Sequence, residues 1–169
     1  LLRAELPPGD PLVPVVEIGC GLGLTGLALL ARGRRVVFTD YVPLAVQAAC
    51  ENADRNGYHG EGRVVDWSHP PAERWPFVVG SDLVYDRTLH LPLLKFLAQV
   101  LPEGGQCWLS DPGRTIGREF IASARQLGFR IQLRDQDQKN AEPAPIGGFQ
   151  VIEIHREERS QKSEVRSRK

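Results

Sequence analysis

The amino-acid sequence predicts an α/β domain with a mostly parallel seven-stranded sheet, helices on both sheet faces and an antiparallel last strand. Three observations support this fold class. Short apolar runs rich in β-branched residues alternate with longer segments of helical apolar spacing, which is typical of a parallel sheet. A glycine-rich turn joins the first apolar run to the first helical segment. The last two runs have no helix between them, and a parallel connection needs such a crossover, so the last strand should reverse direction.

Each expected strand is a short apolar run bounded by Gly, Pro or polar residues. In chain order, the strands are expected at residues 13–18, 36–39, 63–65, 77–81, 106–110, 130–134 and 149–154. The expected helices follow the first, second, fourth and fifth strands, at residues 24–31, 43–56, 89–101 and 116–127. Pro43 suits the first turn of the second helix, and Gly33, Gly57 and Gly128 are placed where helices commonly end.

Length and composition limit the class of protein. The 169 residues fit one domain, which we expect over residues 1–154, followed by a charged and disordered tail at 155–169. Twenty-one basic and 21 acidic residues cancel, so the basic excess typical of nucleic-acid binding is missing. No apolar run approaches the roughly 20 residues that span a bilayer. The scattered cysteines, Cys20, Cys50 and Cys107, favour buried thiols in a reducing compartment over disulfides.

The motif with the most chemical content is the turn after the first expected strand, which reads Glu17-Ile18-Gly19-Cys20-Gly21-Leu22-Gly23. Glycine lets a backbone turn sharply and approach a ligand closely. The helix that follows offers free N–H groups to electronegative ligand atoms, and open α/β sheets bind ligands at this edge. The turn therefore predicts a ligand site, and a tight turn without a ligand is the alternative.

Two kinds of ligand fit this turn. Gly21-x-Gly23-x-x-Gly26 satisfies the dinucleotide fingerprint, with Asp40 near the expected acidic position. The turn also suits S-adenosylmethionine, and with either ligand Asp40 would accept hydrogen bonds from the ribose hydroxyls. Glu17 favours S-adenosylmethionine, because a carboxylate repels a pyrophosphate but attracts the positive amino and sulfonium groups of this cofactor.

Polar residues follow the third and fourth expected strands as well. Asp66 could accept a hydrogen bond from an adenine amine, and Trp67 could provide a flat wall for the adenine ring. The alternative is an acidic helix cap with a Trp packed beneath the loop. Asp82 and Tyr85 follow the fourth strand beside the glycine turn, where we expect them to project into the crevice. The alternative for Asp82 is the cap of the next helix.

The fifth strand is followed by Ser110-Asp111-Pro112-Gly113-Arg114, in which Pro-Gly indicates a tight turn. Arg114 is predicted to hold a carboxylate, either of this chain or of a substrate. The four histidines, His59, His69, His90 and His155, have no metal-ligand spacing, and we expect them on the surface or in loops.

Taken together, the turn at 17–23, the pair Asp66-Trp67 and the motif Asp82-x-x-Tyr85 resemble the protein-lysine methyltransferases of the family-16 group. The segment 110–114 is similar to the branch that modifies the β-subunit of the electron-transfer flavoprotein, and to its bacterial relatives. The resemblance covers about residues 13–154. It implies a Rossmann-like seven-stranded fold, S-adenosylmethionine as cofactor and S-adenosylhomocysteine as product. Family members usually carry an N-terminal helical segment with a Trp that covers the cofactor, and we expect this sequence to start after it.

The resemblance also implies roles for individual residues. Asp82 and Tyr85 would be catalytic, with Asp82 orienting the lysine amine rather than removing its proton. The cofactor would be bound by Glu17, Gly19, Gly21, Gly23, Asp40, Tyr41, Asp66, Trp67 and Ser81. We expect no metal, a protein substrate that presents a lysine, no nucleic-acid or membrane partner, and a monomer. The expected location is the cytoplasm, or the mitochondrial matrix if a targeting segment was removed.

Other functions on the same scaffold stay open. One is methylation of a small nicotinamide-like molecule, for which Trp67 or Trp108 could line the pocket. Another is a scaffold that binds the cofactor or a partner without turnover, and a third is a nicotinamide-dependent oxidoreductase. Nucleic-acid methylation is disfavoured, because no Asn-Pro-Pro-Tyr-type tetrapeptide follows the fourth strand and no basic excess exists.

Overall fold

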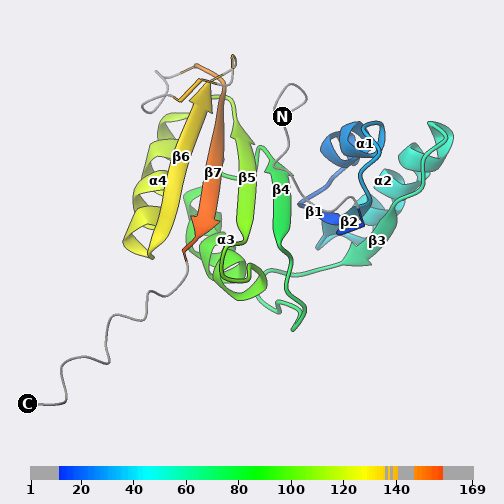
Figure 1. The fold of residues 1–169 in the computed structure, drawn as a ribbon, viewed down its shortest axis with the longest axis horizontal. Coiled ribbons are helices and arrows are strands. Elements are labelled where there is room, and N and C mark those ends of the chain that lie inside the picture. Colours follow the sequence, from blue (N-terminus) through cyan, green and yellow to red (C-terminus); the bar gives the residue numbers. More distant parts are fainter. Residues whose placement is uncertain (1–11, 136, 138, 141–146, 158–169) are drawn as a thin grey trace, which may run out of the picture.

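A computed structural model describes residues 12–135, 137, 139–140 and 147–157 of the chain (Figure 1). Its seven-stranded sheet has the order β3-β2-β1-β4-β5-β7-β6. The strands are β1 (Val15–Ile18), β2 (Val36–Asp40), β3 (Glu61–Val64), β4 (Phe77–Ser81), β5 (Gln106–Asp111), β6 (Phe129–Asp135) and β7 (Gln150–Arg156). The helices are α1 (Leu24–Leu30), α2 (Pro43–Arg55), α3 (Arg87–Val100) and α4 (Thr115–Gln126). The predicted fold class is confirmed.

The strands from β3 to β5 pair in parallel, whereas β7 pairs antiparallel with both β5 and β6. The predicted reversal of the last strand is therefore confirmed. The strand also lies between β5 and β6 rather than at the edge (Figure 1). As a result, β6 contacts the rest of the sheet only through β7 among the strands that the structure describes.

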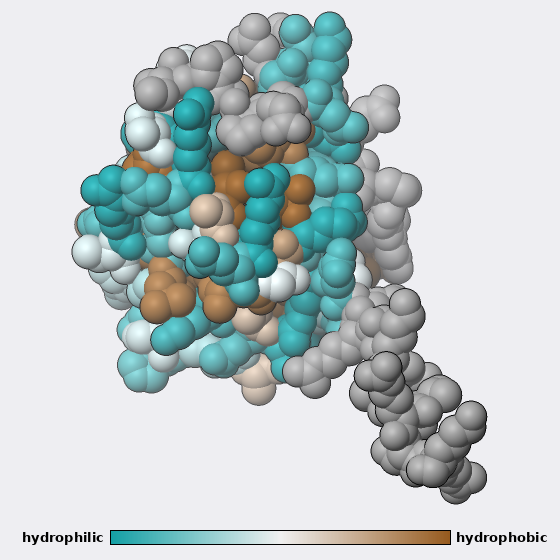
Figure 2. Space-filling view, turned by 90° about the vertical axis from the view of Figure 1, so that its left-hand side faces the viewer, coloured by the Kyte–Doolittle hydropathy of each residue, from teal (hydrophilic) through white to brown (hydrophobic). Residues whose placement is uncertain are grey.

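Apolar side chains form one core layer on each face of the sheet, because successive strand residues point to opposite faces. On one face, α3 and α4 pack on strand residues that include Ile18, Val78 and Ile152. On the other face, α1 and α2 pack on residues that include Phe38 and Val79. Seen from the side of α4 and β6, the surface is mostly hydrophilic and broken by smaller hydrophobic patches (Figure 2). Among the described residues, no helix is long and apolar enough to cross a membrane.

The element bounds differ from the prediction by one or two residues at most ends. Strand β3 begins at Glu61, two residues before the expected start. The sequence pattern misses this start because the residues of β3 are all exposed, so the strand is defined by its backbone pairing with β2. Strand β7 includes His155 and Arg156, which had been expected to begin the tail. Residues 158–169 of that expected tail lie outside the described residues.

The prediction that all four histidines lie on the surface or in loops is wrong for His90, and His155 lies within β7 with 17% of its side chain exposed. His90 is buried within α3, where its Nε2 lies 3.1 Å from the carbonyl oxygen of Val84. Its ring meets the edge of Phe120 at a centroid distance of 5.3 Å. A buried imidazole is tolerated here because the carbonyl satisfies one ring nitrogen. The three cysteines are free, and Cys20 and Cys107 are buried as predicted, whereas Cys50 is partly buried.

Candidate active site

The turn between β1 and α1 contains three glycines whose surroundings differ. Gly19, Gly21 and Gly23 all have positive φ angles, of 56°, 51° and 76°, which glycine adopts at little cost. A Cβ atom on Gly19 would lie 2.5 Å from Leu83 Cδ2, and one on Gly23 would lie 2.7 Å from Ala49 Cβ. At Gly21 a Cβ atom would meet nothing within 4 Å. Packing inside the protein thus explains Gly19 and Gly23, whereas Gly21 leaves space for a ligand.

Glu17 lies at the base of this turn and is buried, with 2% of its surface exposed. Its Oε2 accepts a hydrogen bond of 2.8 Å from the backbone N–H of Gly26 in α1. A Cβ atom on Gly26 would come within 2.6 Å of that same oxygen, so this glycine makes room for the acid. Burial raises the pKa of Glu17 to about 7 despite the hydrogen bonds from Gly26 and Thr25. A cationic ligand group beside it would offset this burial.

Asp40 lies at the end of β2, as predicted, and connects this strand to the glycine turn. Its Oδ2 accepts a hydrogen bond of 3.1 Å from the N–H of Gly21, and its Oδ1 accepts one of 3.0 Å from the N–H of Val42. A carboxylate has about four acceptor positions, so two remain for hydroxyl donors. Tyr41, the next residue, is highly exposed.

Asp66 and Trp67 form a short turn after β3. The Oδ1 of Asp66 accepts a hydrogen bond of 2.8 Å from the N–H of Ser68, and its Oδ2 lies 3.3 Å from His69 Nδ1. These hydrogen bonds, the one from the Ser68 backbone first, lower the pKa of Asp66. Trp67 is partly buried, and its ring lies 6.2 Å from that of Phe96 between centroids. Asp66 therefore caps its own turn rather than a helix, and one part of the indole packs on the core.

At the end of β4, the hydroxyl of Ser81 accepts a hydrogen bond of 2.8 Å from Ser110 Oγ. Asp82 follows with φ = 57°, a left-handed conformation that costs a non-glycine residue about 1–2 kcal/mol. Its N–H donates to the carbonyl oxygen of Ser110 at 2.9 Å. The cap of α3 is Asp86, which accepts from the N–H of Thr88 at 2.8 Å, so the reading of Asp82 as that cap is excluded.

The side chain of Asp82 is held by Arg114, which answers the question of which carboxylate this arginine binds. Nη1 of Arg114 donates to Oδ1 of Asp82, and Nη2 donates to Oδ2 at 3.2 Å. Both side chains are accessible, with 50% of Asp82 and 40% of Arg114 exposed. Tyr85, three residues further, is also exposed.

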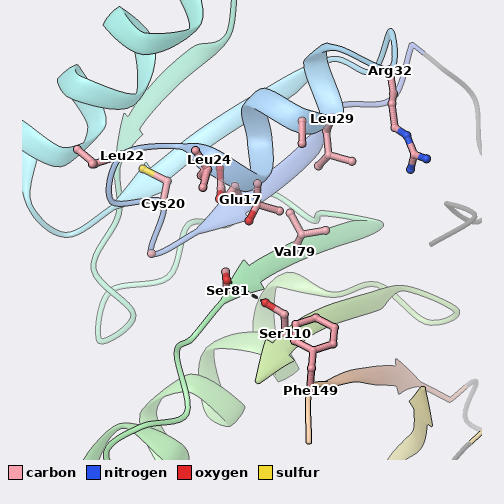
Figure 3. Close-up of a pocket in the computed structure, with 13 residues that line it drawn as sticks. Glu17, Cys20, Leu22, Leu24, Leu29, Arg32, Val79, Ser81, Ser110 and Phe149 are labelled. Atoms are coloured by element: carbon pink, nitrogen blue, oxygen red, sulfur yellow. Dashed lines mark hydrogen bonds between the residues drawn. The ribbon is translucent and has the colours of Figure 1, made fainter. Parts of the chain in front are cut away.

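A cavity of about 290 Å³ opens beside the turn, and Figure 3 shows Glu17, Ser81 and Ser110 facing it from β1, β4 and β5. It extends along α1 to Arg32, and Phe149 borders it from the segment before β7. Of the predicted cofactor residues, the cavity lining includes Glu17, Gly19 and Ser81. The other predicted residues are not part of its lining, namely Gly21, Gly23, Asp40, Tyr41, Asp66, Trp67, Asp82 and Tyr85.

Several lining residues were not predicted. Ser110 lies one residue before the end of β5, the strand next to β4, so the rule that strand ends form the site could have identified it. Phe149 had no such signal, because its place depends on where β7 inserts. Trp108, suggested as a pocket residue, is buried and meets the ring edge of Phe77 at 5.3 Å, outside the cavity. In the described ranges, no three His, Cys, Asp or Glu side chains gather to hold a metal.

Comparison with known proteins is consistent with this site. Residues 11–122 match the model of a family described as lysine methyltransferase. The chain is 36% identical over 91 residues to the ribosomal protein L11 methyltransferase of Aeromonas salmonicida, a match that covers 53% of the chain and 30% of that relative. The chain therefore spans about a third of the length of the curated relatives it matches.

Two solved structures have similar folds. One is a TehB-like SAM-dependent methyltransferase from Corynebacterium glutamicum, with a TM-score of 0.68, 20% identity, and coverage of 86% of this chain and 80% of that one. The other is the ribosomal protein L11 methylase of Lactobacillus delbrueckii, with a TM-score of 0.66, 22% identity, and coverage of 86% and 70%. The fold is thus that of S-adenosylmethionine-dependent methyltransferases.

Proposed function

The chain belongs to the lysine methyltransferase family, and from this premise we propose that it methylates a lysine side chain of a protein with S-adenosylmethionine as methyl donor. One observation of the site carries the proposal. Glu17 is a buried acid, raised in pKa by its burial, that faces a cavity beside an open glycine turn. Keeping such a group costs stability, and a positively charged ligand in the cavity offsets that cost.

The residues around the cavity fit the cofactor. Glu17 would bind its positively charged groups, and Asp40 has free acceptor positions for two ribose hydroxyls. Gly21 would allow close approach of the backbone, while Tyr41, Asp66 and Trp67 would surround the adenosine end. The cavity itself is at the lower limit of ligand-sized pockets, so it suits the amino-acid end of the cofactor, with the nucleoside beside Asp40.

When bound, the cofactor supplies an electrophilic methyl group on a sulfonium. The protein has to present a lysine amine in its neutral form, because the ammonium has no lone pair to react. Lysine has an ordinary pKa of about 10.4, so the neutral form is scarce at neutral pH. Asp82 would accept a hydrogen bond from the amine and direct its lone pair, and Tyr85 would shape the channel. Orientation and exclusion of water are then the main contributions to the rate.

Incubation of the purified chain with methyl-labelled cofactor and a whole-cell extract tests this function. We expect label in a protein band and, after digestion, on lysine. Ribosomal protein L11 is the first purified substrate to try, because curated relatives carry that name, and the electron-transfer flavoprotein β-subunit is the second. Label found only in the small-molecule fraction would contradict protein methylation and would indicate a small-molecule methyltransferase instead.

Asp82→Ala separates catalysis from binding. The variant should reduce transfer to a small residual rate while the calorimetric affinity for S-adenosylhomocysteine stays within a few-fold of the wild type. Parallel loss of transfer and affinity would instead assign Asp82 to cofactor binding or to folding. A monomeric state and a cytoplasmic location stay predictions, which gel filtration and cell fractionation would check.

A further inference from the structure

The Asp82 carboxylate is oriented from two sides. Arg114 donates one N–H to each of its oxygens, and such a two-point contact fixes the plane of a carboxylate. The backbone of Asp82 is fixed too. Asp82 has a left-handed backbone conformation, and its N–H donates a hydrogen bond to the carbonyl oxygen of Ser110 on the neighbouring strand. The side chain that we propose to meet the lysine therefore has one preferred direction.

The turn that carries Arg114 is itself held from below by a buried acid. Asp111 is fully buried, and its Oδ2 accepts hydrogen bonds from the N–H of Gly113 at 2.8 Å and the N–H of Arg114 at 3.1 Å. The same oxygen accepts a third from the amide of Gln150 on β7 at 3.1 Å. A Cβ atom on Gly113 would collide with the backbone of Gly148. These contacts fix the backbone at Arg114, and therefore the point from which its side chain extends toward Asp82.

Stability does not explain this arrangement. An ion pair whose partners are 40–50% exposed contributes little to folding, since water screens it and two long side chains lose freedom. Asp82 also has a left-handed backbone conformation, the only one at a non-glycine residue in the described part of the chain. An ion pair that is well aligned but adds little to the free energy of folding points to a role at the site.

The charges suggest what that role is. A lone carboxylate would attract the protonated form of a lysine, which cannot react. Paired with the permanent cation of Arg114, Asp82 forms a nearly neutral group that still has about two free acceptor positions. Such a group can accept an N–H from a neutral amine without favouring the ammonium.

Resting on the proposed function, we propose that Arg114 is a positioning residue, which aims the Asp82 carboxylate at the substrate lysine and balances its charge. Arg114 itself need not touch the substrate. This assignment predicts that Arg114 acts only through Asp82, so its removal should matter when Asp82 is present and should have no effect when Asp82 is absent.

The chain offers a matched control. Arg87 of α3 binds both carboxylate oxygens of Glu119 on α4 in the same two-point manner. This pair is also exposed, with 67% of Arg87 and 48% of Glu119 accessible. Arg87→Ala therefore removes an exposed two-point ion pair that does not include Asp82, and it should leave the rate within about twofold.

The test is a double-mutant cycle of Arg114→Ala and Asp82→Ala, with Arg114→Lys and Arg87→Ala alongside. The measurements are kcat and KM for the protein that the wild type labels, and the affinity for S-adenosylhomocysteine. Arg114→Ala should lower kcat by about tenfold or more without raising KM or weakening the cofactor analogue. Arg114→Lys, which keeps the charge without the fork, should recover part of the rate, and Arg114→Ala should cost nothing further in the Asp82→Ala background.

The proposal fails if Arg114→Ala stays within twofold of the wild type, if the two single losses multiply in the double variant, or if cofactor affinity falls in parallel with kcat. A wild type that binds the analogue but labels nothing would contradict the proposed function instead. In that case the Asp82–Arg114 ion pair is tested by NMR, through the chemical shift of the guanidinium ¹⁵N signal of Arg114. Asp82→Asn should move this signal and Glu119→Gln should not, and an unmoved signal overturns the proposal.

Discussion

Replacing Glu17 by Gln tests whether the buried acid is retained for a ligand at the expense of the fold. Glutamine keeps an oxygen that can accept the N–H of Gly26 but carries no charge. Burial raises the pKa of Glu17 from an ordinary value of 4.5 to about 7. Between these two values the unfolded chain releases a proton that the folded chain retains, and above pH 7 the folded chain has to hold a buried negative charge.

The expected size follows from that pKa difference. At about 1.4 kcal/mol for each tenfold change in proton affinity, the difference is worth about 3 kcal/mol. Because the folded pKa is the higher one, the contribution of Glu17 to the free energy of unfolding is complete below pH 4.5 and is lost as pH rises through 7. Glu17→Gln should therefore stabilise the ligand-free protein at pH 8 by about 3 kcal/mol, or roughly 6–12 °C in Tm. Near pH 4 the two proteins should unfold alike.

Urea unfolding of both proteins at pH 4 and pH 8, followed by circular dichroism, measures this difference. The control is Glu153→Gln, because Glu153 is equally buried but has a lowered pKa. There the effect of burial is outweighed by hydrogen bonds from His155 and Arg134. Glu153→Gln should therefore lower the free energy of unfolding at pH 8, whereas Glu17→Gln should raise it. A Glu17→Gln variant that gains nothing at pH 8, or gains as much at pH 4, refutes the reasoning.

Two further predictions concern the ligand. The affinity for S-adenosylhomocysteine, measured by calorimetry, should weaken by up to about tenfold per pH unit as pH falls below 7, because the amino group of this ligand needs an ionised Glu17. An affinity that does not change between pH 6 and 8 would show that Glu17 does not bind the ligand. Gly21→Ala should cost about 1 kcal/mol of stability and lower cofactor affinity, whereas Gly23→Ala should cost clearly more stability, because its Cβ would meet Ala49. Equal thermal shifts of the two variants would contradict this reading of the turn.

The sequence predicted most of the fold because apolar periodicity marks each buried element. It missed the start of β3, whose exposed side chains leave no apolar pattern. The strand-end rule likewise placed Asp40 at the end of β2 and Asp82 directly after β4, since the ends of parallel strands meet at one sheet edge.

Other features of the site depend on register and insertion, which no local pattern contains. Arg114 was expected to hold some carboxylate, but its choice of Asp82, 32 residues away, follows from the pairing of β4 with β5. The placement of Phe149 on the cavity follows from the insertion of β7. The burial of His90 depends on how α3 packs, because its ring is satisfied by a carbonyl in another segment.

The insertion of β7 also governs the order in which the molecule can be completed during synthesis. On the ribosome, α4 and β6 emerge before β7, which is the only strand paired with β6 among those that the structure describes. Gln150, which holds the acid beneath Arg114, emerges with β7 too. A nascent chain that stops short of this strand lacks the hydrogen bond from Gln150 to Asp111. The wall of the cavity at Phe149 and the support of the turn before Arg114 are therefore both completed only when β7 is in place.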